Sequence, residues 1–278
     1  MPLTLEQQRL VDRWLPGAHV VADLSWGLID TTVLHLRSVE GDAIVKAGGP
    51  DNHHLAREIA AHTEFTASWL AEHRVGRLIH GALDSNVLVL EYLPGVLADG
   101  TLAATDPEIH RQAGALLADL HCQASKVDDR YEARMDARAL RWLDGAHRLA
   151  RHTVRRLREV IAGHDRAPAV LVPTHGDWQP RNWLVDGGCV LVIDLGRADW
   201  RPALTDFARL SRQQWEGRAD LEAAFLEGYG DDPREAGAWR RALLREAIGT
   251  ACWAYRVGDE PFEQQGQRMV KQALAMVE

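Results

Sequence analysis

The sequence predicts an α+β protein in which a small, β-rich N-terminal part precedes a larger, mostly helical part. Between residues 18 and 93, most apolar residues fall in short runs separated by turn residues, which is typical of strands. After Leu93-Pro94-Gly95, the apolar residues follow a helical period instead. We therefore expect an N-terminal lobe at residues 1–92, a short connector, and a C-terminal lobe at residues 93–278.

Local signals support each element of the N-terminal part. Thr4 and Gln7 form a capping box that starts a short helix, and Pro16-Gly17 ends it. One longer helix is expected from about residue 54 to residue 72, where apolar residues recur on one face. Strands are expected in five apolar runs, at residues 19–24, 32–39, 43–47, 77–83 and 86–93.

The C-terminal part carries helix-start signals and one hairpin signal. Asp106-Pro107 combines an N-cap residue with proline at the first helical position. An arginine-rich helix is expected from about residue 134 to residue 163. Two strands that flank Gly187-Gly188 predict a β-hairpin. Further helices are expected to open at Pro233 and Pro261.

Composition disfavours several classes of protein. The 278 residues are 46% hydrophobic and 26% charged, as in folded globular proteins. The net charge of −8 disfavours a nucleic-acid partner. No apolar run is long enough to span a membrane, and the N-terminus does not resemble a signal peptide, so we expect a cytoplasmic protein. Cys122, Cys189 and Cys252 are far apart and are expected to be buried, reduced thiols.

The segment THGDWQPRNWLVDGGCVLVIDLG, residues 174–196, carries the densest chemical signal. The predicted hairpin folds Asp194 back beside Asn182, and Asp177 lies on the loop before the hairpin. Two carboxylates and one amide oxygen then meet, which is the hard-oxygen ligation that Mg²⁺ takes when substrate phosphates complete its shell. We expect Asn182 and Asp194 to bind the metal, and Asp177 to orient an attacking hydroxyl and accept its proton.

His175-Gly176-Asp177, Asn182 and Asp194 match the signature HGDxxxxN followed by a metal-binding Asp. In these residues the sequence resembles the aminoglycoside phosphotransferase (choline kinase-like) family, which has the protein-kinase fold. The resemblance implies a bilobal protein with an antiparallel sheet in the nucleotide-binding lobe and a helical lobe that holds the catalytic loop and substrate site. It implies a small-molecule kinase that uses Mg²⁺ and transfers the γ-phosphoryl group of ATP or GTP to a hydroxyl.

The resemblance also implies which residues bind the nucleotide. Lys46, at the end of AIVKA, is expected to pair with Glu58 on the following helix and to point at the α- and β-phosphates. The backbone of Glu91, Tyr92 and Leu93, within VLVLEYLPG, is expected to hydrogen-bond the purine.

The segment LSWGLIDTT, residues 24–32, is expected to cover the phosphates. It has a single glycine, unlike the glycine-rich loop of protein kinases. The backbone N–H groups of residues 27–30 and the hydroxyls of Ser25, Thr31 and Thr32 can still cradle phosphate. A plain hairpin turn is the alternative.

Two kinds of side chain are left with open alternatives near the signature. Trp178 either forms a wall of the acceptor site or packs in the helical lobe. Arg181 or Arg197 either neutralises charge on the transferring phosphoryl group or lies at the surface.

The acceptor is suggested by an acidic segment, residues 216–235, which holds seven acidic residues and two arginines. It favours a cationic antibiotic, an aminoglycoside or a capreomycin/viomycin-type cyclic peptide, whose phosphorylation confers resistance; a solvated helix face is the plainer explanation. The candidate substrate carboxylates are Glu216, Glu227, Asp231 and Asp232. The alternatives are a kinase of another small metabolite, such as choline, a sugar or a macrolide, and a catalytically inactive nucleotide-binding regulator.

Overall fold

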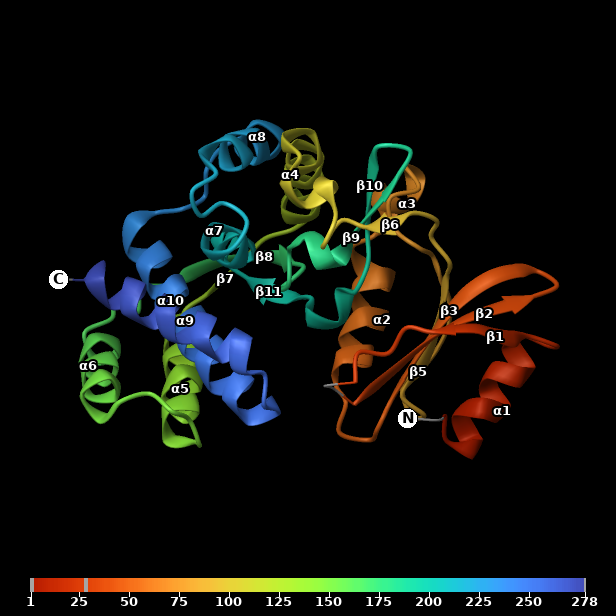
Figure 1. Cartoon of the computed structure of the whole chain (residues 1–278), viewed down its shortest axis with the longest axis horizontal. Helices are drawn as coiled ribbons and strands as arrows, with labels where there is room; N and C mark the ends of the chain where they lie inside the picture. The colour runs from red at the N-terminus through yellow and green to blue at the C-terminus, as the bar shows by residue number, and fades with distance from the viewer. Residues whose placement is uncertain (1–2, 28–29, 278) are drawn as a thin grey trace. The chain divides into compact units, whose positions relative to one another are not determined.

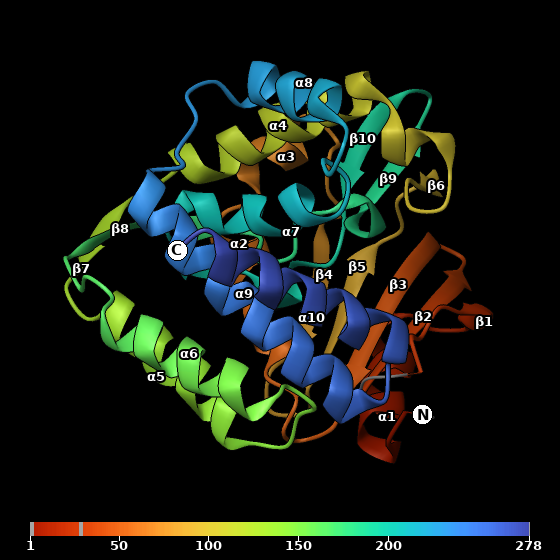
Figure 2. The same cartoon turned by 60° about the vertical axis from the view of Figure 1, so that its left-hand side comes forward.

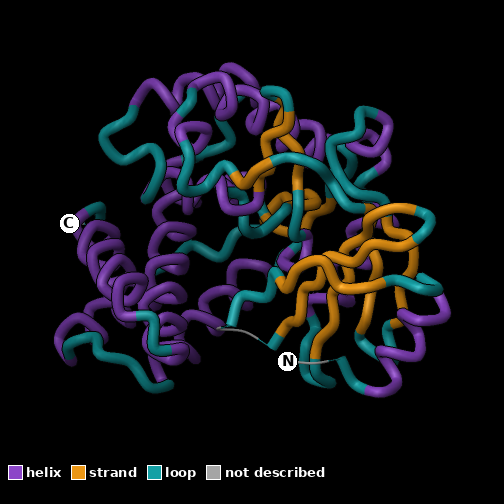
Figure 3. Tube along the Cα trace, turned by 45° about the vertical axis from the view of Figure 1, so that its right-hand side comes forward, coloured by secondary structure: helices purple, strands orange, loops and turns teal. Residues whose placement is uncertain are grey.

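The computed structural model describes residues 3–27 and 30–277, and it confirms an α+β protein with an antiparallel sheet near the N-terminus and a helical C-terminal part (Figure 3). Within these residues the chain forms two compact units. The first unit holds the residues up to 123 together with 175–199 and 220–230, and the second holds 124–174, 200–219 and the residues from 231 on. The lobe boundary expected between residues 92 and 93 stays a prediction.

A five-stranded antiparallel sheet, in the order β1-β2-β3-β5-β4, dominates the first unit (Figure 1). The strands of this sheet are β1 (His19–Asp23), β2 (Thr31–Ser38), β3 (Gly41–Gly48), β4 (Leu78–Ala82) and β5 (Val87–Glu91). Its remaining helices and strands are α1 (Leu5–Trp14), α2 (His54–Glu64), α3 (Ala67–Ala71), β6 (Val96–Leu97), α4 (Pro107–Cys122), β9 (Trp183–Asp186), β10 (Cys189–Val192) and α8 (Ala219–Tyr229). The five predicted strands of the sheet and the predicted hairpin are therefore present.

Helices cover both faces of this sheet, because its central strands are apolar on both sides. Successive residues of a strand point to opposite faces. In β5, Val87 and Val89 belong to the core cluster that contains α1, whereas Leu88 and Leu90 pack with α2. The same alternation in β3 places Lys46 on the side of α2, two residues after Ile44.

The helix expected from residue 54 to residue 72 is two helices, α2 and α3. The chain leaves the helical conformation at Phe65 and Thr66, and the Thr66 hydroxyl donates to the carbonyl of His62 at 2.7 Å. After this break, the indole of Trp69 is buried and its Nε1 donates to the carbonyl of Leu116 at 3.1 Å. The periodic pattern did not reveal the break, because it depends on this distant contact with α4.

The second unit contains a three-stranded sheet in which β8 lies between β7 and β11, and a group of helices. Its elements are β7 (Lys126–Asp128), α5 (Tyr131–Asp144), α6 (Arg151–Ala162), β8 (Ala169–Thr174), β11 (Asp199–Arg201), α7 (Phe207–Arg212), α9 (Ala236–Val257) and α10 (Glu260–Ala275). Helices α9 and α10 lie side by side (Figure 2). A Cβ atom at Gly266 would come within 2.5 Å of the backbone nitrogen of Ala251, so this close approach of α9 and α10 requires glycine.

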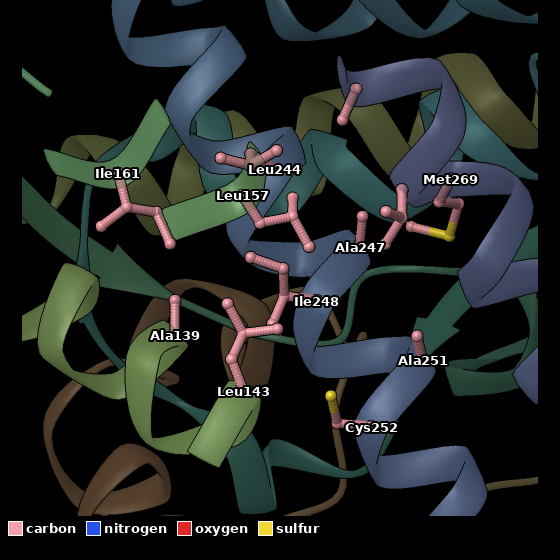
Figure 4. Packing of buried hydrophobic residues seen from close by; sticks show 12 residues of the cluster. Ala139, Leu143, Leu157, Ile161, Leu244, Ala247, Ile248, Ala251, Cys252 and Met269 are labelled. Carbon is pink, nitrogen blue, oxygen red and sulfur yellow. The ribbon is translucent and has the colours of Figure 1, made fainter. Parts of the chain in front are cut away.

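The arginine-rich helix expected from residue 134 to residue 163 is also two helices, α5 and α6. Ala139 of α5 and Ile161 of α6 belong to one core cluster with residues of α9 and α10 (Figure 4). In one straight helix, at about 1.5 Å per residue, these two side chains would lie about 33 Å apart along the axis. The chain therefore turns at Gly145, so that both apolar faces reach the same core.

The last two helices begin close to their expected positions. Helix α9 begins at Ala236, three residues after Pro233, and Glu235 caps it by accepting hydrogen bonds from two backbone N–H groups. Helix α10 begins at Glu260 with Pro261 in its first turn and Asp259 as the N-cap residue.

One expectation about the cysteines is wrong. Cys252 is buried in the core of the second unit, and burial raises the pKa of its thiol to about 11. Cys122 and Cys189, in contrast, are exposed. Cys122 ends α4 and Cys189 follows the hairpin turn, and both positions face solvent. In the part of the chain that is described, no helix combines the length and the apolar character needed to cross a bilayer.

Candidate active site

Lys46 lies at the centre of an ion-pair cluster in the first unit. Its Nζ donates to Glu58 Oε1 at 2.7 Å and Oε2 at 3.0 Å, and to Asp194 Oδ1 at 3.0 Å. The Glu58 side chain is 1% exposed and the Asp194 side chain is 49% exposed. The expected Lys46–Glu58 pair is present, and Asp194 extends it towards solvent.

Lys46 and Asp194 hold each other in the ionised form, whereas burial raises the pKa of the Glu58 carboxyl. Burial disfavours the charge on Lys46, but the carboxylates of Asp194 and Glu58 outweigh burial and raise the pKa of its ammonium above the usual value. The Lys46 ammonium in turn lowers the pKa of the Asp194 carboxyl. At neutral pH the sheet therefore presents a fixed cation beside an ionised, half-exposed carboxylate.

The hairpin places Asp194 next to Asn182, as predicted. Strands β9 and β10 pair with Trp183 opposite Val192, and the N–H of Ile193 donates to the carbonyl of Asn182 at 3.1 Å. Asp194 has a φ of 64° and a ψ of 66°, a left-handed conformation that is unfavourable for a residue with a Cβ atom. In this conformation Asp194 Oδ1 accepts a hydrogen bond from Lys46 Nζ.

His175 fixes the loop that carries Asp177. Its Nε2 donates to the carbonyl of Ile193 at 3.0 Å, and its Nδ1 accepts from the backbone N–H of Asp177 at 3.3 Å. Both contacts are satisfied by the neutral imidazole that carries its proton on Nε2. The turn between these two residues passes through Gly176, whose φ of 78° favours glycine.

Asp177 is a buried carboxylate, 3% exposed, in contact with two nitrogen donors. Gln179 Nε2 donates to its Oδ1 at 2.5 Å, and Arg181 Nη2 donates to its Oδ2 at 2.6 Å. Its electrostatic effect on Asp194 raises the pKa of that carboxyl, opposing Lys46. Asp177 and Asp194 therefore act on one another within the same site.

Asn182 and Asp194 offer the oxygen atoms that a Mg²⁺ ion requires. The amide nitrogen of Asn182 donates to the carbonyl of Asp177 at 2.7 Å, which leaves its Oδ1 to accept or to bind a metal. Within the described ranges, no group of three or more His, Cys, Asp or Glu side chains is arranged to hold a metal ion. A pair of oxygen donors fits Mg²⁺, which takes its other ligands from water and substrate phosphates.

The predicted purine contacts lie at the end of β5. The N–H of Glu91 donates to the carbonyl of Arg77 at 2.9 Å, and the N–H of Tyr92 donates to the carbonyl of Asp42 at 3.4 Å. The N–H of Leu93 makes no hydrogen bond to another described residue. Of these three residues, Leu93 therefore has the backbone donor that remains for a nucleobase.

The predicted phosphate-covering loop joins β1 to β2, and its residues Leu28 and Ile29 lie outside the described residues. The Ser25 Oγ accepts from the N–H of Val33 at 2.9 Å, and the Thr31 Oγ1 accepts from Asn52 Nδ2 at 2.8 Å. Both hydroxyls thus have structural contacts, so their predicted role in phosphate binding stays a prediction.

Trp178 packs in the interior. Its side chain is 1% exposed, and its ring centroid lies 6.1 Å from that of Trp69 and 5.8 Å from that of Trp183. Of its two proposed roles, packing is the one that the geometry describes, because an indole so buried offers almost no surface to an acceptor.

The four candidate substrate carboxylates are exposed and are divided between the two units. Glu227 lies on α8 in the first unit, whereas the other three belong to the second unit. Glu216 accepts from Gln272 Nε2 at 3.0 Å. Asp232 accepts from Arg234 Nε at 2.8 Å and Nη2 at 2.7 Å. Asp231 and Glu227 have no such pairing within the described ranges.

Two side chains at the site were not identified from the sequence. Gln179 is buried beside Asp177, and Trp26 lies over Arg181, with the guanidinium carbon 5.5 Å from the ring centroid. The only signal for Gln179 is its place two residues after Asp177. Trp26 precedes the single glycine of its loop, and nothing local indicates its contact with residue 181.

His62 follows Glu58 by one helical turn and gives the site a pH-dependent contribution to stability. Burial lowers the pKa of His62 to about 3. The unfolded chain binds this proton near pH 6.5 and the folded chain does not, so acidification favours unfolding. We expect the free energy of unfolding to fall by up to about 1.4 kcal/mol per pH unit between roughly pH 6 and pH 4 from this residue.

His62→Leu should reduce this slope in urea denaturation measured across that pH range. The exposed His73 provides the matched control, since His73→Leu should leave the slope nearly unchanged. Equal slopes for the wild type and His62→Leu would show that His62 is protonated in the folded protein.

Comparison with known proteins places this site in a family. A family model described as "Phosphotransferase enzyme family" (APH) matches residues 20–243. A ternary complex of a thermostable mutant of the aminoglycoside phosphotransferase APH(4)-Ia with ADP and hygromycin B superposes with a TM-score of 0.72, at 13% identity over 98% of this chain and 99% of that chain. No curated protein sequence matches significantly.

Two other solved structures have the same fold. The macrolide 2′-phosphotransferase MphH from Brachybacterium faecium has a TM-score of 0.62 at 18% identity, over 94% of this chain and 96% of that chain. The choline kinase LicA from Streptococcus pneumoniae has a TM-score of 0.68 at 14% identity, over 96% of this chain and 97% of that chain.

The fold and the family match together define a protein-kinase-like phosphotransferase. The chain belongs to the phosphotransferase enzyme family. The predicted resemblance, the predicted fold class and the predicted enzyme class, at the level of a phosphotransferase, are confirmed.

Proposed function

We propose that this protein transfers the γ-phosphoryl group of ATP or GTP to a hydroxyl of a small, cationic antibiotic. The observation that carries the proposal is the meeting of the Lys46–Glu58–Asp194 ion pairs with Asp177 and Asn182 in one site. The similar structure of APH(4)-Ia, which is a complex with ADP and hygromycin B, supports the use of a nucleotide. The Mg²⁺ ion, held by Asn182 and Asp194, would neutralise phosphate charge.

Each residue has a distinct role in this proposal. Lys46 is held by Glu58 and binds the α- and β-phosphates, and the N–H of Leu93 binds the nucleobase. Asp177 orients the acceptor hydroxyl and takes its proton as the phosphoryl group is transferred. Lys46 and Arg181 contact three carboxylates, those of Glu58, Asp194 and Asp177, and Mg²⁺ would supply further positive charge for a triphosphate.

A cationic acceptor is supported by the net charge of −8 and by the exposed acids between residues 216 and 235. The APH(4)-Ia structure contains hygromycin B, an acceptor of the class proposed. Because Asp232 is paired with Arg234, its neighbour Asp231 is the better of these two carboxylates for binding a cation. Each exposed contact of this kind contributes about 1 kcal/mol or less.

The test is an assay of nucleoside diphosphate release with ATP or GTP across hygromycin B, capreomycin, choline, a macrolide and glucose. For a cationic acceptor, the KM should rise steeply as the Debye length falls from ~10 Å at 0.1 M salt to ~3 Å at 1 M salt. Asp231→Asn should raise the acceptor KM severalfold with little change in kcat, because this contact is equal in the ground and transition states.

Glu159→Gln, an exposed change on α6 in the same unit, is the matched control and should leave the acceptor KM unchanged. Highest activity on glucose, or an acceptor KM that does not change with salt, would contradict the cationic acceptor and leave the kinase proposal intact. No turnover with any acceptor, together with retained nucleotide binding, would favour the inactive nucleotide-binding regulator.

A further inference from the structure

Arg181 contacts the proposed base on one side and the proposed phosphate-covering loop on the other. Its Nη2 donates to Asp177 Oδ2 at 2.6 Å, and its guanidinium carbon lies 5.5 Å from the centroid of the Trp26 ring. The Arg181 side chain is 33% exposed, whereas that of Asp177 is 3% exposed. The guanidinium therefore closes the solvent side of a buried carboxylate.

This pairing restricts Asp177 as a base. Its Oδ1 already accepts from Gln179, a buried and neutral donor. Its Oδ2 accepts from a permanently charged guanidinium, which stabilises the carboxylate and makes it a poorer proton acceptor. An acceptor hydroxyl must give its proton to one of these oxygens, and Arg181, which is long and partly exposed, is the charged donor that can rotate away from the carboxylate.

A terminal phosphate is a strong competing partner for this guanidinium. An acceptor hydroxyl that bonds Asp177 must also lie in line with the phosphoryl group, so the terminal phosphate lies close to both. A guanidinium binds phosphate with two parallel hydrogen bonds and keeps its charge at any physiological pH. Lys46 is already balanced by Glu58 and Asp194.

We propose that Arg181 is a positioning residue that detects the terminal phosphate. With no nucleotide or with a diphosphate, it pairs with Asp177. With a triphosphate it turns to the terminal phosphate, which takes its positive charge away from Asp177 Oδ2 and makes the carboxylate a better base for the acceptor hydroxyl, while Trp26 keeps the guanidinium at this end of the site. The inference rests on the proposed function, and it implies that Arg181 strengthens binding of triphosphate over diphosphate.

Calorimetry with the Mg²⁺ complexes of AMP-PNP and ADP tests this inference. Arg181→Gln should weaken AMP-PNP binding by about tenfold or more, the effect of one lost charge-assisted interaction, and should change ADP binding less than twofold. Arg9→Gln, an exposed change on α1, is the matched control and should alter neither affinity.

The Asp177→Asn background gives a second, independent readout. There Arg181 is no longer held by a carboxylate, so AMP-PNP need not displace it. Arg181→Gln should then cost AMP-PNP binding more than in the wild type, by a further factor of about three or more, whereas a purely structural Arg181 would show no such coupling.

The outcomes separate this inference from the proposed function. If the wild type binds neither Mg-AMP-PNP nor Mg-ADP, the proposed function is wrong. If it binds both and Arg181→Gln leaves the ratio of the two affinities unchanged, only the role of Arg181 is wrong. The role of Arg181 is supported if Arg181→Gln lowers the ratio of AMP-PNP affinity to ADP affinity, and if this decrease is larger in the Asp177→Asn background.

Discussion

Asp177→Asn is expected to reduce kcat by about 10²–10⁴-fold, equivalent to ~3–5 kcal/mol of transition-state stabilisation. The amide cannot take the proton of the acceptor hydroxyl, and Asp177 is the carboxylate that the loop between His175 and Asn182 holds in place. Nucleotide binding should be retained, because Lys46, Asn182 and Asp194 are unchanged. Steady-state turnover with the best acceptor and calorimetry with Mg-AMP-PNP give the two measurements.

Asp186→Asn is the matched control, because Asp186 is an exposed acid beside the hairpin turn that follows the same loop. It should keep nearly full activity. If Asp177→Asn retained more than a tenth of the wild-type kcat, while thermal unfolding showed an intact fold, Asp177 would not be the base.

Changes in the Lys46 cluster should have the second large effect, and they separate stability from function. Lys46→Met leaves Glu58, which is 1% exposed, as an unpaired buried carboxylate and should destabilise the protein by about 3–5 kcal/mol. Asp194→Ala removes a half-exposed side chain, so its effect on stability should be much smaller. Both variants should lose most Mg-nucleotide binding and turnover.

The double variant Lys46→Met, Glu58→Gln tests this reasoning. It removes the unpaired charge and should recover most of the lost stability in urea denaturation, but none of the activity. Activity close to that of the wild type in Asp194→Ala or in the double variant would contradict the proposed nucleotide site. A stable Lys46→Met variant would instead show that Glu58 is protonated or solvated.

The sequence by itself determined the elements whose causes are local. The capping box at Thr4 and Gln7 starts α1 where expected. The Gly187-Gly188 turn sets the register that brings Asn182 and Asp194 together. These features follow from spacing along the chain, so they required no knowledge of distant contacts.

The structure alone decided the features that depend on distant partners. Each of the two long helices that were predicted is two helices in the structure. The first break accompanies the contact of Trp69 with α4, and the second lets α5 and α6 pack on one core with α9 and α10. Asp232 was a candidate for binding the substrate, but in the structure its carboxylate accepts hydrogen bonds from Arg234.

The contact of Arg181 with Asp177 and Trp26 belongs to the same class. The sequence gives the charge and size of a side chain, but tertiary packing determines which residue it contacts. Many pairings of similar energy are possible until the tertiary fold is formed.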